Sequence, residues 1–322
     1  MAGLFTVIQG AVAQGVLWGI MAVGIYITYK ILNLSDLTVD GSFALGGCVC
    51  AVMIINFNVD PFLATLIAVA AGITAGAVTG VLHTMFDIPA ILAGILTQIS
   101  LWSINLRIMG GKSNIPLLNV ETVISKFVGR SGSTTIATAS PLAQTLGLTQ
   151  SQASLIIGII IVVLVVLFMY WFFGTEIGCA LRATGNNEDM IRALGVDIKI
   201  TKLIAFMFAN GLVALAGSLV CQSQKYADIN MGTGAIVIGL AAIIIGEVFM
   251  KRFINFGLKL SSAVVGAVAY FIIRAFVLRL GMNANDMKLL SALIVAIALI
   301  VPIVTKKIRE KRAYQEGDVE DC

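Results

Sequence analysis

The feature that most constrains the fold of this chain is a series of apolar runs, several of them about 20 residues long. An α-helix rises about 1.5 Å per residue, so a run of this length crosses the roughly 30 Å hydrocarbon core of a bilayer. The composition agrees, because 59% of the 322 residues are hydrophobic and 12% are charged, whereas a soluble domain carries about 25% charged residues. The short alternating segments typical of a β-barrel are not visible. The sequence therefore predicts an all-α polytopic membrane protein.

The apolar runs predict about nine transmembrane helices, and counts of eight to ten fit the same pattern. We expect a single transmembrane domain over residues 1–305, followed by a charged tail at 306–322. The expected spans are 7–29, 43–57, 61–85, 90–109, 154–173, 203–220, 235–250, 254–280 and 289–304.

Lysine and arginine are unevenly distributed between the two sets of loops that these spans create. Cytoplasmic loops of membrane proteins carry an excess of both residues. The loop Gly174–Lys202 and the tail fall in the richer set, so we expect both in the cytoplasm and the N-terminus outside. The long hydrophilic stretch 110–152 then lies outside. Because the acidic segment Glu316–Asp321 follows the basic part of the tail, we expect a membrane-flanking tail and no nucleic-acid partner.

The loop Gly174–Lys202 is a polar segment between two long apolar runs. Within it the sequence predicts a short helix of about two turns. Asn186 is expected to cap its start, and Asp189, three residues further on, to reach back in a capping-box arrangement. Gly195 offers the left-handed conformation that commonly ends a helix.

The predicted short helix carries an apolar surface made by Met190, Ile191 and Leu194. Glu188 and Arg192 stand four residues apart beside it, and we expect them to pair. A helix of about two turns is not stable alone in water. We therefore expect it to dock on another surface.

The stretch Asn33–Ser42 is a polar interruption at the start of an apolar segment and predicts a re-entrant or broken helix near Ser35–Ser42. Asp36 and Asp40 stand four apart and are expected to share a helix face, with Ser35 as the cap and Asp36 in the first turn. A charge within a bilayer costs at least about 2.5–3.5 kcal/mol. These acids therefore belong either to a capped, solvated re-entry or to the lining of a translocation pathway.

Other polar residues interrupt the apolar runs, among them Gln98, Glu247 and Arg274. Glu247 lies four residues before Lys251, and the two are expected to pair. Arg274 has apolar neighbours on both sides, so it either extends toward the outer surface or holds the carboxylate of a substrate. The candidate pathway residues are Ser35, Asp36, Asp40, Ser42, Gln98, Glu247 and Arg274.

A weak internal similarity links Ile31–Gly47 with Tyr226–Gly246. Both segments run from an acid through threonine and glycine into a Gly/Ala-rich apolar sequence. Interrupted segments at corresponding positions of two halves indicate inverted repeats around a central pathway. Chance similarity between glycine-rich apolar sequences is the alternative.

The chain shows no pattern typical of an enzyme. Gly111-Lys112-Ser113 matches the end of a phosphate-binding loop, but Leu106 occupies the position of the required earlier glycine. The single histidine, His83, has no plausible Ser–His–Asp or Cys–His partners, and no metal-ligand spacing is present. We therefore expect no catalytic residue, metal or cofactor in this chain, and any nucleotide chemistry must come from another polypeptide.

With its flanks included, the loop Gly174–Lys202 resembles the cytoplasmic loop of the integral membrane permeases of branched-chain amino-acid and ribose-type ABC importers. That loop has the form G-x-A-x-R-A-x-G-x-N, then a short helix, then L-G. The matching residues are Gly178, Ala180, Arg182, Ala183, Gly185, Asn187, Leu194 and Gly195. A following small-residue run matches at Ala205, Phe206, Gly211, Ala214 and Gly217.

The segment SDLTVDGSFALGG, which begins at Ser35, is similar to a bacterial subgroup described as tryptophan/tyrosine-type ABC permeases. It departs from the more usual family segment at Asp36–Asp40. Two acids suit an amine-bearing or polar ligand better than a branched-chain aliphatic one.

The resemblance implies an importer permease of the bacterial cell membrane, with a second copy of itself, cytoplasmic ATPase subunits that bind ATP, and an extracytoplasmic substrate-binding lipoprotein as partners. It implies a coupling helix near Asn187–Leu194 that docks on the ATPase. The implied coupling residues are Asn186, Asn187, Glu188, Asp189, Met190, Arg192, Leu194 and Gly195. The implied substrate is a small solute, with an aromatic-type amino acid favoured. The alternative is a secondary transporter or channel that works alone and needs no docking helix.

Overall fold

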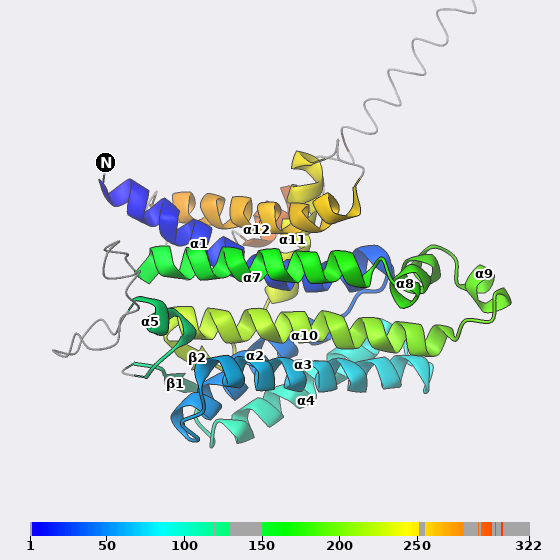
Figure 1. Ribbon diagram of the computed structural model, residues 1–322, viewed down its shortest axis with the longest axis horizontal. Coiled ribbons are helices and arrows are strands. Elements are labelled where there is room, and N and C mark those ends of the chain that lie inside the picture. The colour runs from blue at the N-terminus through cyan, green and yellow to red at the C-terminus, as the bar shows by residue number, and fades with distance from the viewer. Residues whose placement is uncertain are drawn as a thin grey trace, which may run out of the picture.

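The computed structural model describes residues 2–118, 120–128, 150–250 and 255–279, and near the C-terminus residues 289, 291–297, 300 and 304. Over these residues the chain is mostly helical, and the long helices run side by side (Figure 1). The predicted all-α fold class is confirmed.

Seven of the described helices are long and apolar enough to cross a membrane. They are α1 (Ala2–Tyr26, continued by the π-helix η1 at Ile27–Ile31), α2 (Thr38–Ile55), α3 (Pro61–Thr84), α4 (Ala90–Ile108), α7 (Gln150–Phe172), α10 (Ile198–Gln224) and α12 (Phe256–Arg279). An eighth apolar helix, α11 (Ala235–Phe249), is shorter. The predicted span 289–304 is described only in part, so the count of nine remains a prediction.

Short elements lie at the two ends of the long helices (Figure 1). At one end are α5 (Val123–Val128) and a two-stranded antiparallel sheet of β1 (Asn114–Pro116) and β2 (Tyr226–Asp228). At the other end are α8 (Glu176–Asn186) and α9 (Glu188–Ala193). The loop that contains α8 and α9 therefore lies at the opposite end from the described part of the stretch 110–152.

Asp60 explains where α3 begins. Its carboxylate accepts a hydrogen bond from the backbone N–H of Phe62 at 2.9 Å, and Pro61 takes the first helical position, where a missing N–H costs nothing. Lys126 of α5 also donates to this carboxylate. The bond to Lys126 lowers the pKa of the Asp60 carboxyl below its usual value, helped by the bond from Phe62. The same side chain thus caps α3 and holds α5 over it.

Small residues let α10 approach α2 and α3 closely. A Cβ added at Gly217 would lie 2.0 Å from the backbone oxygen of Phe43, and one at Gly46 would lie 2.1 Å from that of Ala214. At these distances the backbones of α2 and α10 touch. Such contacts stabilise helix pairs in a bilayer, where lipid removes the hydrophobic drive for association.

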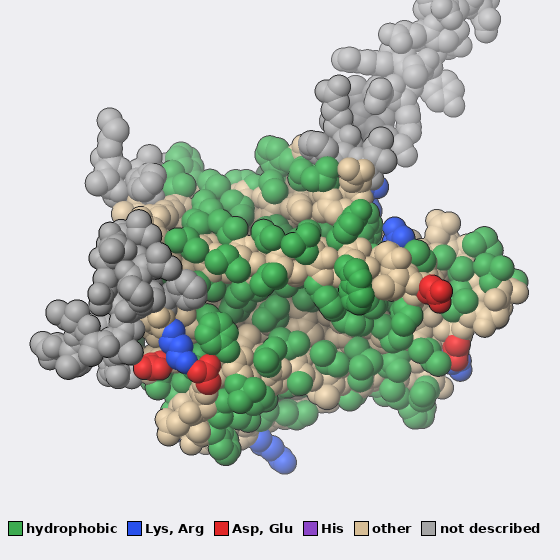
Figure 2. All heavy atoms as spheres, viewed as in Figure 1, with side chains coloured by type: hydrophobic (Ala, Val, Ile, Leu, Met, Phe, Trp, Pro, Cys, Tyr) green, Lys and Arg blue, Asp and Glu red, His purple; other side chains and the backbone are tan. Residues whose placement is uncertain are grey.

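The outer surface of the bundle is apolar. Figure 2 shows hydrophobic side chains across the middle of one face, with charged side chains mostly toward its ends. Helix α7 shows this most clearly. In its most apolar stretch the mean hydropathy is 3.1, and only 22% of the residues are buried. Large apolar side chains such as Leu164 and Trp171 are exposed. A helix of this kind faces lipid, so the chain is a multi-pass membrane protein.

Candidate coupling and substrate sites

The short helix predicted within the loop Gly174–Lys202 is present as α9, and its cap is Asn187. The Asn187 side chain accepts a hydrogen bond from the backbone N–H of Met190 at 3.1 Å. The prediction that Asn186 is the cap was wrong, because Asn186 is the last residue of α8 and Asn187 has the extended backbone that a cap needs. Among the described hydrogen bonds, none joins Asp189 to the cap in the predicted capping box.

Gly195 ends α9 as predicted. Its φ is +81°, and its N–H donates to the carbonyl oxygen of Arg192 at 3.0 Å. The next N–H, of Val196, donates to the carbonyl oxygen of Ile191 at 3.4 Å. These two bonds form a Schellman motif, which requires the left-handed residue that glycine adopts without strain.

The apolar side chains of α9 and its end point in two directions, one toward the protein interior and the other toward solvent. Ile191 is 4% exposed and anchors the helix, whereas Met190 and Leu194 are 50% and 69% exposed. Glu188 forms an ion pair with Lys202 at 2.7 Å, so the predicted pairing with Arg192 was wrong. Because Lys202 lies in the first turns of α10, the ion pair ties α9 to the start of that helix.

Helix α8 was missed by the sequence analysis, which placed one short helix in the loop. Thr175 caps it by accepting a hydrogen bond from the backbone N–H of Gly178 at 3.3 Å. Near its other end, a Cβ added at Gly185 would lie 1.7 Å from the carbonyl oxygen of Ile31, the last residue of η1. The Asn33 side chain donates to the Gly185 carbonyl at 3.5 Å. The loop that contains α8 and α9 therefore contacts the segment that connects α1 to α2.

The chain is non-helical between η1 and α2, and Asp36 lies in this connector rather than in the first turn of a helix. Asp36 is 2% exposed. Its carboxylate accepts hydrogen bonds from the Thr38 backbone N–H at 2.9 Å and from the Asn210 side chain of α10 at 2.7 Å. The predictions that Ser35 caps the helix and that Asp36 shares a helix face with Asp40 were wrong, because α2 begins two residues after Asp36.

Asp36 belongs to a buried polar network that joins four helices. The Ser42 hydroxyl donates to the Asn210 side-chain oxygen at 2.7 Å. The hydroxyl of Thr38 contacts that of Thr79 at 2.8 Å, and Thr79 donates to Thr97 of α4 at 3.0 Å. Buried polar groups are stable when paired in this way. The network holds α2, α3, α4 and α10 together.

Asp40 caps a second helix. Its two carboxylate oxygens accept hydrogen bonds from the backbone N–H groups of Gly234 and Ile236, each at 2.9 Å, at the start of α11. The first turn of α2 is thereby tied to the N-terminus of α11, which joins the two segments that the weak internal similarity linked. A carboxylate is favourable at this position because of the helix dipole.

Asp40 and Gln98 line one cavity of about 440 Å³ between α2, α4 and the segment before α11. Asn105 lines the same cavity and is 1% exposed, and its amide nitrogen and oxygen have no hydrogen-bond partner among the described residues. Two of the predicted pathway residues are thus brought together. Asn105 was not among the predicted pathway residues, because its lack of a hydrogen-bond partner among the described residues is visible only in the structure.

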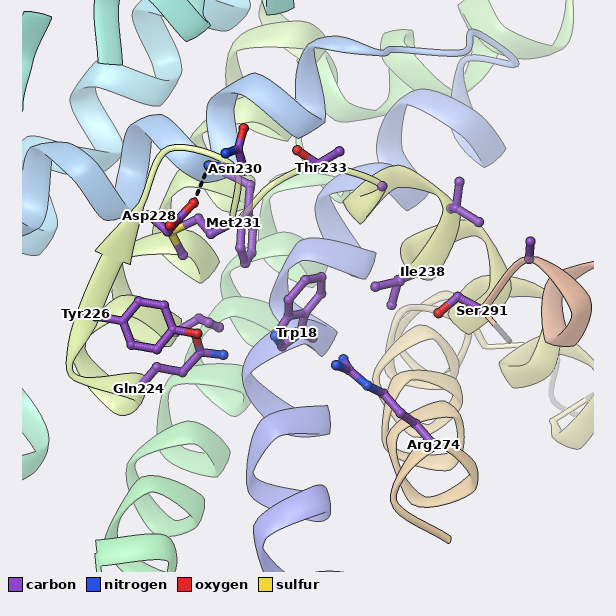
Figure 3. Close-up of a pocket in the computed structure, with 15 residues that line it drawn as sticks. Trp18, Gln224, Tyr226, Asp228, Asn230, Met231, Thr233, Ile238, Arg274 and Ser291 are labelled. Carbon is purple, nitrogen blue, oxygen red and sulfur yellow. Dashed lines mark hydrogen bonds between the residues drawn. The ribbon is translucent and has the colours of Figure 1, made fainter. Parts of the chain in front are cut away.

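Arg274 lines a different cavity of about 570 Å³ (Figure 3). Its walls come from α1, α2, α10, β2, α11 and α12, together with residues 291 and 292. The close-up shows the Arg274 side chain extending from α12 toward Trp18. This cavity and the Asp40–Gln98 cavity share Thr233.

Glu247 and Lys30 form an ion pair, with their nearest atoms 2.8 Å apart. Lys30 lies on η1 and Glu247 near the end of α11, so the pair joins two elements far apart in sequence. The predicted partner, Lys251, lies outside the described residues. Glu247, Asp36 and Ser42 line neither of the two cavities.

An apolar helical bundle that holds cavities of mixed lining, with a capped helix projecting at one end, is the architecture expected of a membrane transport component. The chain belongs to the family of permease components of branched-chain amino acid transport systems, whose model matches residues 7–301. It is an ABC permease of the branched-chain amino acid/ribose type.

Three relatives illustrate the breadth of the similarity. The chain is 37% identical over 295 residues to a tyrosine transport system permease protein of Clostridioides difficile, covering 92% of this chain and 90% of the relative. It is 31% identical over 292 residues to an uncharacterized protein of Rickettsia prowazekii, covering 90% and 95%. It is 24% identical over 298 residues to a ribose import permease protein of Escherichia coli, covering 92% and 84%. No solved structure matches the chain significantly.

Proposed function

We propose that this permease carries an amino acid of aromatic type across the bacterial cell membrane into the cytoplasm. ATP is bound and hydrolysed by separate ATPase subunits, so this chain needs no cofactor of its own. An extracytoplasmic binding protein delivers the ligand, and two copies of the permease work together. The observation that carries the proposal is α9, a capped helix that presents Met190 and Leu194 to solvent at one end of an otherwise lipid-facing bundle.

The contacts of α9 give it two connections to the bundle. Glu188 holds it to Lys202 of α10. Through α8, it is also linked to the close packing of Gly185 on Ile31. A displacement of α9 by a partner therefore reaches both α10 and the connector that contains Asp36. Packed backbone contacts transmit such displacements because they cannot be compressed further.

The two cavities supply the proposed route for the substrate. Arg274 faces one of them, and Asp40 and Gln98 face the other. Rocking of the helices between outward- and inward-open states, driven through α9, would expose them in turn. The 37% identical relative is named as a tyrosine transport permease, which supports an aromatic amino acid as the substrate.

The coupling assignment is tested by placing a charge on the exposed face of α9. Leu194→Asp and Arg192→Glu should abolish co-purification of the permease with its ATPase and reduce ATP-driven uptake about tenfold or more, since a buried unpaired charge is costly at an interface. Leu194→Met is the matched control, because it keeps an apolar side chain of similar volume. All variants should reach wild-type abundance in the membrane, because Leu194 is exposed.

An undiminished complex and undiminished uptake for Leu194→Asp would remove α9 from the coupling contact. Uptake by the permease reconstituted without any ATPase would instead favour the alternative of a self-sufficient transporter or channel.

A further inference from the structure

The cavity beside Arg274 contains two hydrogen-bond donors that lack acceptors. The Arg274 side chain has no carboxylate within 4.0 Å among the described residues, and its recorded ring contact is with Phe271, 5.6 Å from the guanidinium carbon to the ring centre. Trp18 is 7% exposed, and its indole N–H has no acceptor in the described part of the chain. A buried indole N–H ordinarily finds a partner. Among the described residues, neither donor therefore has an acceptor.

The two donors point to an anionic group. Figure 3 shows the guanidinium of Arg274 directed at Trp18 across the cavity. An arginine guanidinium binds a carboxylate through paired, charge-assisted hydrogen bonds. The indole N–H provides a further donor for the same group, and the low polarity around Trp18 strengthens both interactions.

The remaining walls suit an aromatic side chain with a polar end. Phe43, Val237 and Ile238 provide apolar surface on the α2 and α11 sides. The wall formed by the end of α10 and by β2 carries Gln224, Tyr226 and Asp228, and the close-up shows these three away from Arg274. Asp228 accepts hydrogen bonds from Asn230 and Asn114 and has no lysine or arginine partner among the described residues.

We propose that this cavity binds the transported amino acid, with Arg274 and the Trp18 indole N–H holding its α-carboxylate and the aromatic side chain directed toward the wall of Gln224, Tyr226 and Asp228. The proposal rests on the proposed function, since it names the place inside the permease where the substrate is held. It predicts that a ligand without a carboxylate is discriminated against at this site.

Binding to the purified permease in lipid nanodiscs tests the site without the ATPase or the binding protein. The three tryptophans are Trp18, Trp102 and Trp171, so Trp102→Phe with Trp171→Phe leaves Trp18 as the only reporter. L-tyrosine and L-phenylalanine should change the Trp18 emission in a saturable manner, and tyramine, which lacks the carboxylate, should bind about tenfold or more weakly. Arg274→Gln should weaken L-tyrosine binding to a similar degree, and Arg274→Lys should restore part of it.

Arg279→Gln is the matched control, because Arg279 lies five residues further along the same helix, is exposed and does not line the cavity. The Arg279→Gln variant should bind L-tyrosine with the same affinity as the reporter protein that retains Arg274. The proposal would be overturned if Arg274→Gln bound L-tyrosine as tightly as the protein with Arg274. It would also be overturned if the protein with Arg274 bound tyramine as tightly as L-tyrosine.

The complete importer separates this proposal from the proposed function. If Arg274→Gln co-purifies with the ATPase but loses about nine-tenths or more of L-tyrosine uptake while Arg279→Gln does not, the site is supported. If wild-type importer transports L-tyrosine and Arg274→Gln transports it equally well, the substrate site is wrong and the importer function stands. If the wild-type chain forms no complex with an ATPase and transports no amino acid, the proposed function itself fails.

Discussion

The Asp36 carboxylate accepts hydrogen bonds from two donors of the protein itself. The donors are the Thr38 N–H at the start of α2 and the Asn210 amide of α10. Asp36 is 2% exposed, and its hydrogen bonds join α10 to the start of α2. We therefore expect it to stabilise the packing of these helices rather than to bind the transported substrate. Its contribution to folding can therefore be measured apart from transport.

We predict that Asp36→Ala lowers the free energy of unfolding by about 1–3 kcal/mol, because it leaves the buried Asn210 amide short of an acceptor and removes the acceptor of the Thr38 N–H at the start of α2. Cys48, Cys50 and Cys221 are free and buried, so a thiol-reactive dye reports thermal unfolding of the purified permease. The control Ser35→Ala changes an exposed neighbour and should leave the unfolding temperature unchanged. Normal stability together with lost uptake would instead assign Asp36 to the pathway.

For α9, the sequence predicted the types of residue that begin and end the helix better than the role of each individual residue. Either Asn186 or Asn187 can cap a helix, and the choice depends on which one has an extended backbone, which α8 decides by including Asn186. Asp36 and Asp40 were expected on one helix face because their spacing is four residues. They cap different helices, since the chain leaves its helical path between Leu32 and Leu37.

Through the close contact between α8 and η1, the loop Gly174–Lys202 reaches the transmembrane core. Gly185 has no room for a side chain next to the Ile31 carbonyl. The non-helical connector beyond it leads directly to Asp36. The π-helical turn η1 is itself a form of helix found frequently at functional sites.

We predict that Gly185→Ala uncouples ATP hydrolysis from uptake, because the added methyl group must displace either α8 or η1. The expected result is about a tenfold lower ratio of substrate transported to ATP hydrolysed by the reconstituted importer. Gly10→Ala is the control, since a Cβ at Gly10 meets no atom within 4 Å. An unchanged ratio for Gly185→Ala would show that the contact does not transmit motion.

The apolar runs predicted the positions of most long helices, since burial in lipid requires long continuous apolar segments. The start of α10 was placed late, at residue 203, because its first residues are polar. Asp197 begins the helix by accepting hydrogen bonds from the N–H groups of Lys199 and Ile200, at 2.9 and 3.5 Å. Helix α8 was missed although Thr175 caps it and Gly178, Leu181 and Thr184 form its buried face, because only one short helix was expected in this loop.

At the scale of the whole molecule, the ion pair between Lys30 and Glu247 links the end of the α1 segment to the end of α11. The two side chains are 46% and 39% exposed. Solvent screening at this exposure limits the interaction to about 0–1 kcal/mol. A pair of this strength can break and re-form during a transport cycle.

We predict that Lys30→Glu and Glu247→Lys each lower the unfolding temperature slightly and that the double exchange restores part of the loss. A double-mutant cycle on thermal unfolding should give a coupling energy of about 0–1 kcal/mol that decreases at high salt. Glu188→Lys, which disrupts the separate pair with Lys202, is the comparison and should not couple to Lys30→Glu. A strong coupling that salt does not affect would contradict this picture of an exposed pair.

The caps made by Asp36 and Asp40 have a consequence for the electric field inside the bundle. Each helix N-terminus carries about half an elementary positive charge, and α2 and α11 both begin beside one of these two acids. The carboxylates therefore offset the positive ends of both helices, and Asp40 does so at the start of α11, beside the two cavities that share Thr233. A zwitterionic amino acid has no net charge and can pass such a region without a counter-ion. A solute with a net charge would be left uncompensated there, because the two carboxylates already offset the helix ends.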